Sequence, residues 1–112
     1  MAVLVASTSA LSVAANSKSA DQVSGQYQYS GKGKYTLAVK GSVTGLNVTV
    51  AVGGISLVND LAIPFTGTAG TISLADNVIV SQLMNGGRVE LTFRNTTGGA
   101  ITVDSQLLYD PM

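Results

Sequence analysis

The sequence of 112 residues contains no histidine, no cysteine and no tryptophan, and only 11% of its residues are charged. Without cysteine, the chain has no disulfide framework and no thiolate ligands for a metal ion. Without histidine, its many serine and threonine hydroxyls have no imidazole base that would turn one of them into a nucleophile. No apolar run reaches the length of about 18 residues that a membrane-spanning helix needs, so we expect no membrane contact. These absences direct the search for function to surfaces and assembly rather than to bond-making chemistry.

The charged residues are balanced, with six basic and six acidic side chains and a formal net charge of zero. A nucleic-acid-binding protein normally has a basic excess, because neutralising phosphates supplies most of its affinity. Near-zero net charge instead favours association with other proteins. We therefore expect protein partners and no direct contact with nucleic acid.

The acidic residues do not predict a catalytic or metal site. They are scattered along the chain at Asp21, Asp60, Asp76, Glu90, Asp104 and Asp110, with no Asp-x-Asp run and no EF-hand loop. Glu90 and Asp104 would meet if the last two strands formed a hairpin, as a dyad for glycoside hydrolysis requires. Each falls on the polar face of its segment, where two carboxylates would repel each other. Arg88 and Arg94 are therefore better partners for them than the other carboxylate. We expect no enzyme activity, no metal and no cofactor.

Short runs of alternating apolar and polar residues fill most of the sequence, and this period of two is the pattern of half-buried strands. The clearest runs are 23–29, 35–39, 46–52, 89–93 and 101–109, with weaker ones at 55–58, 61–65 and 71–75. Turn signals separate them, including Gly53-Gly54 and a hairpin-like loop at 95–99. Pro64 marks an edge strand or a strand end. About eight strands at this spacing predict a single all-β domain, either a sandwich or a small barrel.

Residues 76–84 are compatible with two structures. Asp76 or Asn77 would cap the first turn of a helix, and Gly86 or Gly87 would stop it. The β-branched run Val78-Ile79-Val80 favours a strand. Both interpretations remain open from the sequence, and we expect at most one short helix.

The two ends of the chain carry apolar residues in small polar surroundings. Residues 1–19 alternate weakly, so they form either a first strand or an extended arm, and we expect an arm attached to a sandwich domain at 20–112. We predict that the apolar residues of both ends contact a partner: Val3, Leu4, Val5, Leu11, Val13, Leu107, Leu108 and Tyr109.

Three stretches carry a resemblance to a known family: the start AVLVASTSALSVAANS, the middle strand GLNVTVAV and the close GGRVELTFRNTTGGAITVDSQLLYDP. Together they resemble the small decoration, or cement, proteins of the heads of tailed double-stranded-DNA bacteriophages. The resemblance spans most of the chain. It implies a jelly-roll sandwich on the outer capsid surface of the virion, made in the host cytoplasm. It also implies that such a protein clamps neighbouring major capsid protein subunits as a homo-oligomer, for which we favour a dimer over a trimer.

Decoration of a capsid is our first hypothesis, ahead of a role as the major capsid protein. A chain of 112 residues is small for a shell that must withstand packaged DNA, and it lacks the basic arm of a shell that contacts the genome. The alternative is a binding module, such as a carbohydrate-binding or fibre-like adhesin sandwich. That alternative needs exposed aromatic residues, and the chain has only four tyrosines and two phenylalanines.

Overall fold

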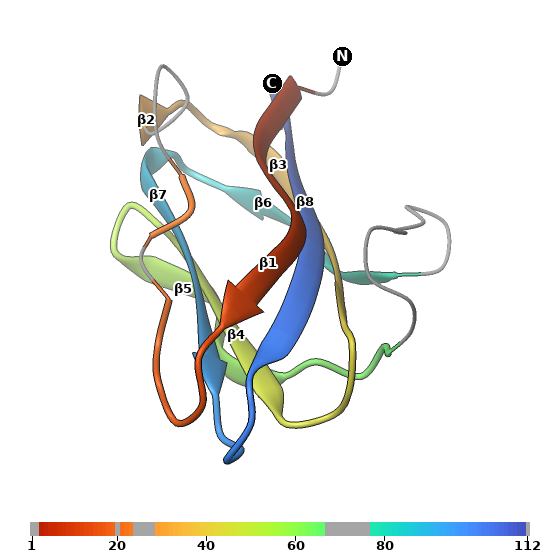
Figure 1. The fold of residues 1–112 in the computed structure, drawn as a ribbon. Helices are drawn as coiled ribbons and strands as arrows, with labels where there is room; N and C mark the ends of the chain where they lie inside the picture. The colour runs from red at the N-terminus through yellow and green to blue at the C-terminus, as the bar shows by residue number, and fades with distance from the viewer. Residues whose placement is uncertain (1–2, 20, 24–28, 67–76, 112) are drawn as a thin grey trace.

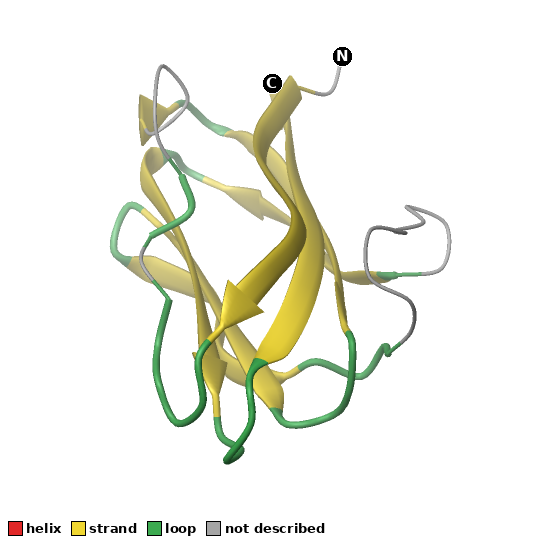
Figure 2. Ribbon diagram, viewed as in Figure 1, coloured by secondary structure: helices red, strands yellow, loops and turns green. Residues whose placement is uncertain are grey.

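The computed structural model describes residues 3–19, 21–23, 29–66 and 77–111, and these residues form an all-β fold (Figure 1). No helix is present in this part of the chain (Figure 2). The strands are β1 (Val3–Val13), β2 (Tyr29–Ser30), β3 (Gly33–Gly41), β4 (Leu46–Val52), β5 (Ile55–Ala62), β6 (Val78–Met84), β7 (Gly87–Asn95) and β8 (Ile101–Pro111). The all-β sandwich predicted from the alternation is confirmed.

The strands form two antiparallel sheets of four strands each. The first sheet has the order β1-β8-β3-β6 and the second has the order β2-β7-β4-β5. The pairing is nested, because each strand lies beside the one that is equally far from the other end of the chain: β1 with β8, β2 with β7, β3 with β6, and β4 with β5. Of these, β4 and β5 form a hairpin through the turn at Gly53-Gly54.

The predicted hairpin between the last two strands is wrong. β7 belongs to the second sheet and β8 to the first, so the loop at 95–99 carries the chain across the sandwich. Both strands bury one face, and this pattern fits strands that face each other across a core as well as strands that pair. A short loop rich in Gly and Thr does not distinguish between the two connections.

The core lies between the sheets and consists of the inward side of each alternating run. From the second sheet it takes Leu46, Val48, Val50, Val52, Val89, Leu91 and Phe93, and from the first Tyr35, Leu37, Val39, Ile101, Val103 and Leu107. None of these exposes more than 1% of its surface. Full burial of a Val, Leu or Phe side chain contributes roughly 1.5–3 kcal/mol. The rings of Tyr35 and Tyr109 stack within the first sheet, with their centroids 4.9 Å apart.

Two segments that the sequence left open are strands. Val78–Met84 is β6, which pairs with β3, so the β-branched run outweighs the capping signals. Asn77 precedes it in a bend, and Asp76 lies outside the described residues. The strand predicted at 71–75 and most of the one predicted at 23–29 also lie outside them.

The N-terminal segment is a strand of the sandwich rather than a free arm. β1 pairs with β8 along its length, and its residues Val5, Ala6 and Val13 are buried. The expected boundary between an arm at 1–19 and a domain at 20–112 therefore does not describe the fold. Weak alternation hid the strand, because two register shifts in β1 interrupt the period of two.

Residues 17–19, 21 and 22 cover the outer edge of β7, where β2 is too short to reach. The amides of Ser19 and Gln22 donate to the carbonyl oxygens of Phe93 and Leu91, at 2.7 and 2.8 Å. In the other direction, the hydroxyl of Ser19 and Oδ1 of Asp21 accept from the amides of Phe93 and Leu91, each at 3.0 Å. Side-chain oxygens thus replace strand carbonyls and leave this edge of the second sheet paired.

Candidate interaction surface

The register of β1 and β8 brings the two predicted apolar ends together. Val3 lies opposite Tyr109 and Leu4 opposite Leu108, although about a hundred residues separate them in the sequence. The two ends therefore form one region of the first sheet rather than two separate contact points.

Four of the eight apolar side chains predicted at the interface are not available to a partner. Val5, Val13, Leu107 and Tyr109 expose between 0 and 9% of their surface, because they point between the sheets. Our prediction that they contact a partner is therefore corrected. The sequence shows which residues share a face but not which face is covered by the second sheet.

The remaining predicted interface residues differ in exposure. Leu4 is 47% exposed on the outer face of the first sheet. Leu108 is half-buried beside it, and Leu11 is half-buried against the core. The side chain of Val3 lies outside the described part of the structure.

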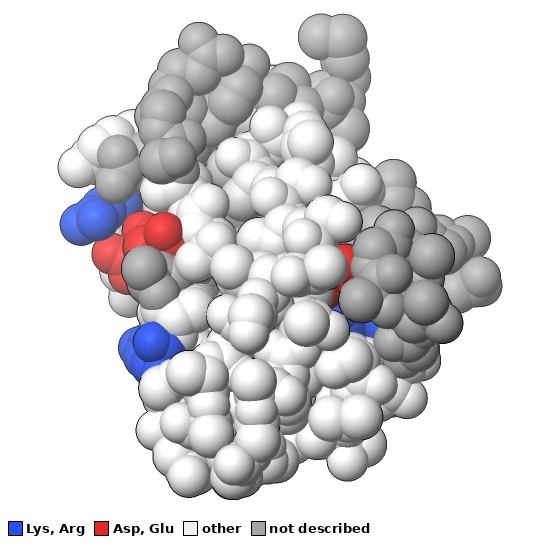
Figure 3. Space-filling model, viewed as in Figure 1, with Lys and Arg blue, Asp and Glu red and all other residues white. Residues whose placement is uncertain are grey.

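Leu4 and Leu108 belong to an uncharged area in the middle of that outer face. One row across the sheet consists of Leu4, Leu108, Thr36 and Ser81. In the next row Ser7 and Gln106 reach the surface, whereas Ala38 beside them is fully buried. In Figure 3, the surface over β1 and β8 carries no described charge, and the charged side chains lie toward the sides of the view. An uncharged area of this kind suits contact with another protein, because little charge has to be desolvated.

Charged pairs lie at both ends of this uncharged area. Lys34 is opposite Asp110 at one end, and Lys40 is opposite Asp104 at the other. Lys40 and Asp104 are buried, with 7 and 3% of their surfaces exposed. Oδ1 of Asp104 accepts a hydrogen bond of 2.7 Å from the amide of Ala10, where β1 bulges and Ala10 has a φ of 52°. Asp104 thereby fixes the course of β1.

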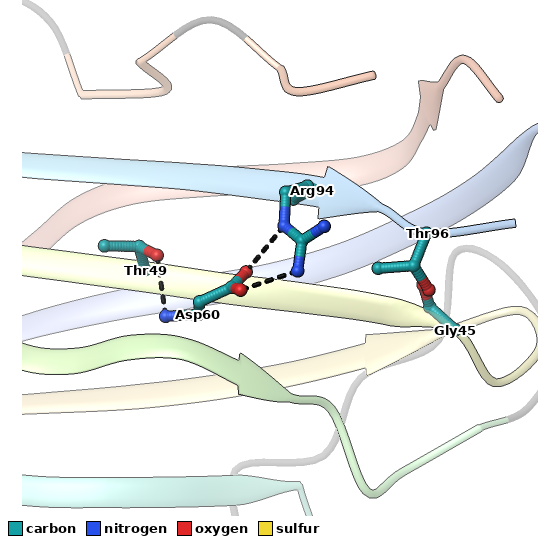
Figure 4. Close-up of polar contacts among 5 residues, drawn as sticks. All are labelled: Gly45, Thr49, Asp60, Arg94 and Thr96. Carbon is teal, nitrogen blue, oxygen red and sulfur yellow. Dashed lines mark hydrogen bonds and ion pairs between the residues drawn. The ribbon is translucent and has the colours of Figure 1, made fainter. Parts of the chain in front are cut away.

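The outer face of the second sheet is charged but largely neutralised by its own ion pairs. Nε and Nη2 of Arg94 donate to the two carboxylate oxygens of Asp60, at 2.9 and 2.6 Å (Figure 4). These hydrogen bonds lower the pKa of Asp60 and raise that of Arg94. Asp60 sits in a bulge of β5 with a φ of 51°, and its amide donates to the hydroxyl of Thr49 at 2.9 Å. Of the predicted ion pairs, Arg88 with Glu90 is present, at 3.6 Å. Arg94 pairs with Asp60 instead of Glu90 or Asp104.

A shallow polar hollow of about 340 Å³ lies beside this ion pair. It is lined by Asn16, Ser17, Lys18, Arg94, Asn95 and Thr96. The sequence did not indicate it, because residues 16–18 and 94–96 meet only in the folded chain. There Lys18 pairs with Arg94, and the amide of Asn95 donates to the carbonyl oxygen of Ser17 at 2.8 Å. Arg94 is already paired with Asp60, so Lys18 is the principal charge that the hollow offers to a ligand.

The described residues form no cluster of three or more His, Cys, Asp or Glu side chains that would hold a metal ion. Glu90 and Asp104 lie on different sheets and form no dyad. Within the same residues, no helix is long and apolar enough to cross a membrane.

No protein-family model matches the chain, and neither a curated protein nor a solved structure is similar enough to count as a match.

Proposed function

We propose that this protein is a structural protein that decorates and stabilises the outer surface of an icosahedral phage capsid. The observation that carries the proposal is the uncharged area in the middle of the outer face of the first sheet, with Leu4 exposed beside Leu108. A contact of this kind repeats at every symmetry-related position of a shell, so even a weak interface gains from multivalency. Each contact made only in the intact shell stabilises that shell by mass action.

The nested strand order supports a jelly-roll arrangement, in which a long antiparallel ribbon folds over to form two sheets. Jelly rolls occur in viral capsid proteins and also in lectins, so the fold is compatible with both the decoration role and the carbohydrate-binding alternative. The resemblance to decoration proteins favours the first. The alternative has a weaker basis, since the hollow beside Lys18 is lined by polar residues and contains no aromatic ring on which a sugar would stack.

Binding to purified heads of tailed double-stranded-DNA phages tests the proposal. The full chain is mixed with DNA-free heads, and bound protein is measured by co-sedimentation and located by negative-stain microscopy. We expect saturable binding at symmetry-related outer sites and survival of the heads to a higher temperature. Equal survival at full occupancy would reject the stabilising role.

Two matched variants locate the contact. Leu4→Asp places a charge on the uncharged face and should lower occupancy at least about tenfold, since desolvating one unpaired charge costs more than about 1.4 kcal/mol. Leu61→Asp makes the same change at a residue of similar exposure on β5, 42% against 47%, and should leave occupancy unchanged. Equal losses in both variants would place the contact elsewhere. Binding to a glycan array without binding to any head would support the adhesin alternative.

A further inference from the structure

We propose that two copies of the chain pair through their β1 strands, antiparallel, across a two-fold axis at Ser7. The pairing would join the two first sheets into one continuous sheet of eight strands. The inference extends the proposed assembly role by naming the partner, a second copy of this chain, and the strand that binds it.

The outer edge of β1 is open. One side of the strand pairs with β8. Among the described residues, none outside β8 hydrogen-bonds to the backbone between Leu4 and Ser12, while the carbonyl of Val13 accepts from the side chain of Asn95 at 3.0 Å. In an edge strand, alternate N–H and C=O groups point away from the sheet, where another strand can bind them.

β1 also lacks most features that keep edge strands from pairing. Its 11 residues, VLVASTSALSV, contain no charge and no proline. Edge strands are commonly protected by charged side chains, especially Lys, by Pro, by short length, by β-bulges or by a covering segment. Of these features, β1 has its two bulges. Ser7 is exposed and small, so a second strand can approach it without displacing a side chain.

The other edges of the sandwich are less suitable. β5 carries the paired carboxylate of Asp60 and is followed by Pro64, and β2 has only two residues. The outer edge of β7 beyond β2 is covered by residues 17–19, 21 and 22. β6 is the nearest competitor because it also has no charge, but it is seven residues long, against 11 for β1. Since strand addition gains hydrogen bonds in proportion to length, β1 is the better template.

Two features of β1 make a second copy the fitting partner. Its register shifts, between Leu4 and Ala6 and between Thr8 and Leu11, lie on either side of Ser7. With a two-fold axis at Ser7, the first bulge of one copy faces the second bulge of the other copy, and the reverse. The bends of the two paired strands therefore match. With no charge on the strand and a net charge of zero, self-pairing creates neither a like-charge contact nor long-range repulsion.

Sedimentation equilibrium of the full chain tests the dimer without any shell. We expect a concentration-dependent mass that approaches twice the 11.4 kDa of one chain, with little dependence on salt. Ser7→Lys places two ammonium groups opposite each other at the axis and should weaken the dimer roughly tenfold or more. Gln82→Lys puts the same charge on an exposed position of β6 and should change nothing.

Cysteine substitutions test the register, because the chain has no cysteine of its own. Residues directly opposite in an antiparallel pair have Cα atoms about 4.5–5.5 Å apart, within the range of a disulfide. Ser7→Cys should therefore form a disulfide-linked dimer under mild oxidation. Ser12→Cys, exposed on the same strand but five residues from the axis, and Gln82→Cys should form one at least about tenfold more slowly.

Each contrary result is decisive. A chain that remains monomeric at every concentration overturns the inference, and if it still binds phage heads, the proposed function stands without the dimer. A dimer weakened by Gln82→Lys but not by Ser7→Lys pairs through β6. A dimer in which Ser12→Cys links faster than Ser7→Cys has a different axis from the one proposed.

Discussion

Asn95 on β7 donates its amide Nδ2 to the carbonyl oxygen of Val13 on β1, at 3.0 Å, and so joins the edges of the two sheets. The same amide nitrogen donates to the carbonyl of Gly99 at 2.7 Å, and Oδ1 accepts from the amide and hydroxyl of Thr97, at 2.9 and 2.8 Å. Asn95 is only 1% exposed. Both polar groups of its side chain therefore make two hydrogen bonds each, at the point where the chain crosses from the second sheet to the first.

Replacing this amide by a carboxylate should destabilise the protein strongly. Asn95→Asp keeps the shape but puts an oxygen where Nδ2 faces two carbonyl oxygens. We expect a loss of about 3 kcal/mol in the free energy of unfolding, from lost hydrogen bonds and burial of an unpaired charge. Asn59→Asp, at an exposed position of β5, is the control and should change stability by less than about 0.5 kcal/mol. Urea denaturation of both variants is the measurement, and equal midpoints would contradict the role of Asn95.

The close contact between Gly53 and Gly87 lies where the β4–β5 turn packs against the start of β7. We predict that a substitution at this contact destabilises the protein. A Cβ atom on Gly87 would lie 2.5 Å from Cα of Gly53, and Gly87 has a φ of 127°. Gly87→Ala should therefore cost at least about 2 kcal/mol, because backbone cannot move aside as a flexible side chain does. Gly98→Ala, where a Cβ meets nothing within 4 Å, is the matched control and should be nearly neutral. A thermal midpoint unchanged in Gly87→Ala would mean that the two turns separate easily.

The sequence predicts the strands better than it predicts how they pair. β4 spans Leu46–Val52, as its strict alternation indicates, and Pro64 follows the end of β5. The nested pairing depends on contacts between distant residues, such as Leu4 with Leu108, which no local pattern contains. For the same reason, the predicted interface mixed buried residues such as Leu107 with exposed ones such as Leu4. The polar hollow and the side-chain pairing along β7 were missed because they combine segments about 75 residues apart.

Leu107 and Leu4 should therefore respond oppositely to truncation. Leu107 is fully buried, so Leu107→Ala should cost about 2–5 kcal/mol through lost burial and the cavity that remains. Leu4 is nearly half exposed, so Leu4→Ala should cost less than about 1 kcal/mol while it weakens binding to heads. Denaturation and co-sedimentation of both variants separate folding from binding. A large loss of stability in Leu4→Ala would mean that Leu4 belongs to the core.

The ion pair of Asp60 with Arg94 predicts a dependence of stability on pH. Hydrogen bonds from Arg94 hold the pKa of Asp60 below its ordinary value of 3.8 in the folded protein. A lowered pKa means that the folded state favours the charged carboxylate, so the stabilisation is fully present above the ordinary pKa. It is lost as the pH falls through the lower, folded-state value.

Asp60→Asn should therefore be less stable than the natural chain at neutral pH, and the difference should shrink in acid. The effect should also weaken at high salt, because both side chains are nearly half exposed, at 44 and 47%. Urea midpoints of the two proteins, measured across acidic and neutral pH, are the test. A difference that stays constant into acid would show that the carboxylate charge of Asp60 does not stabilise the fold.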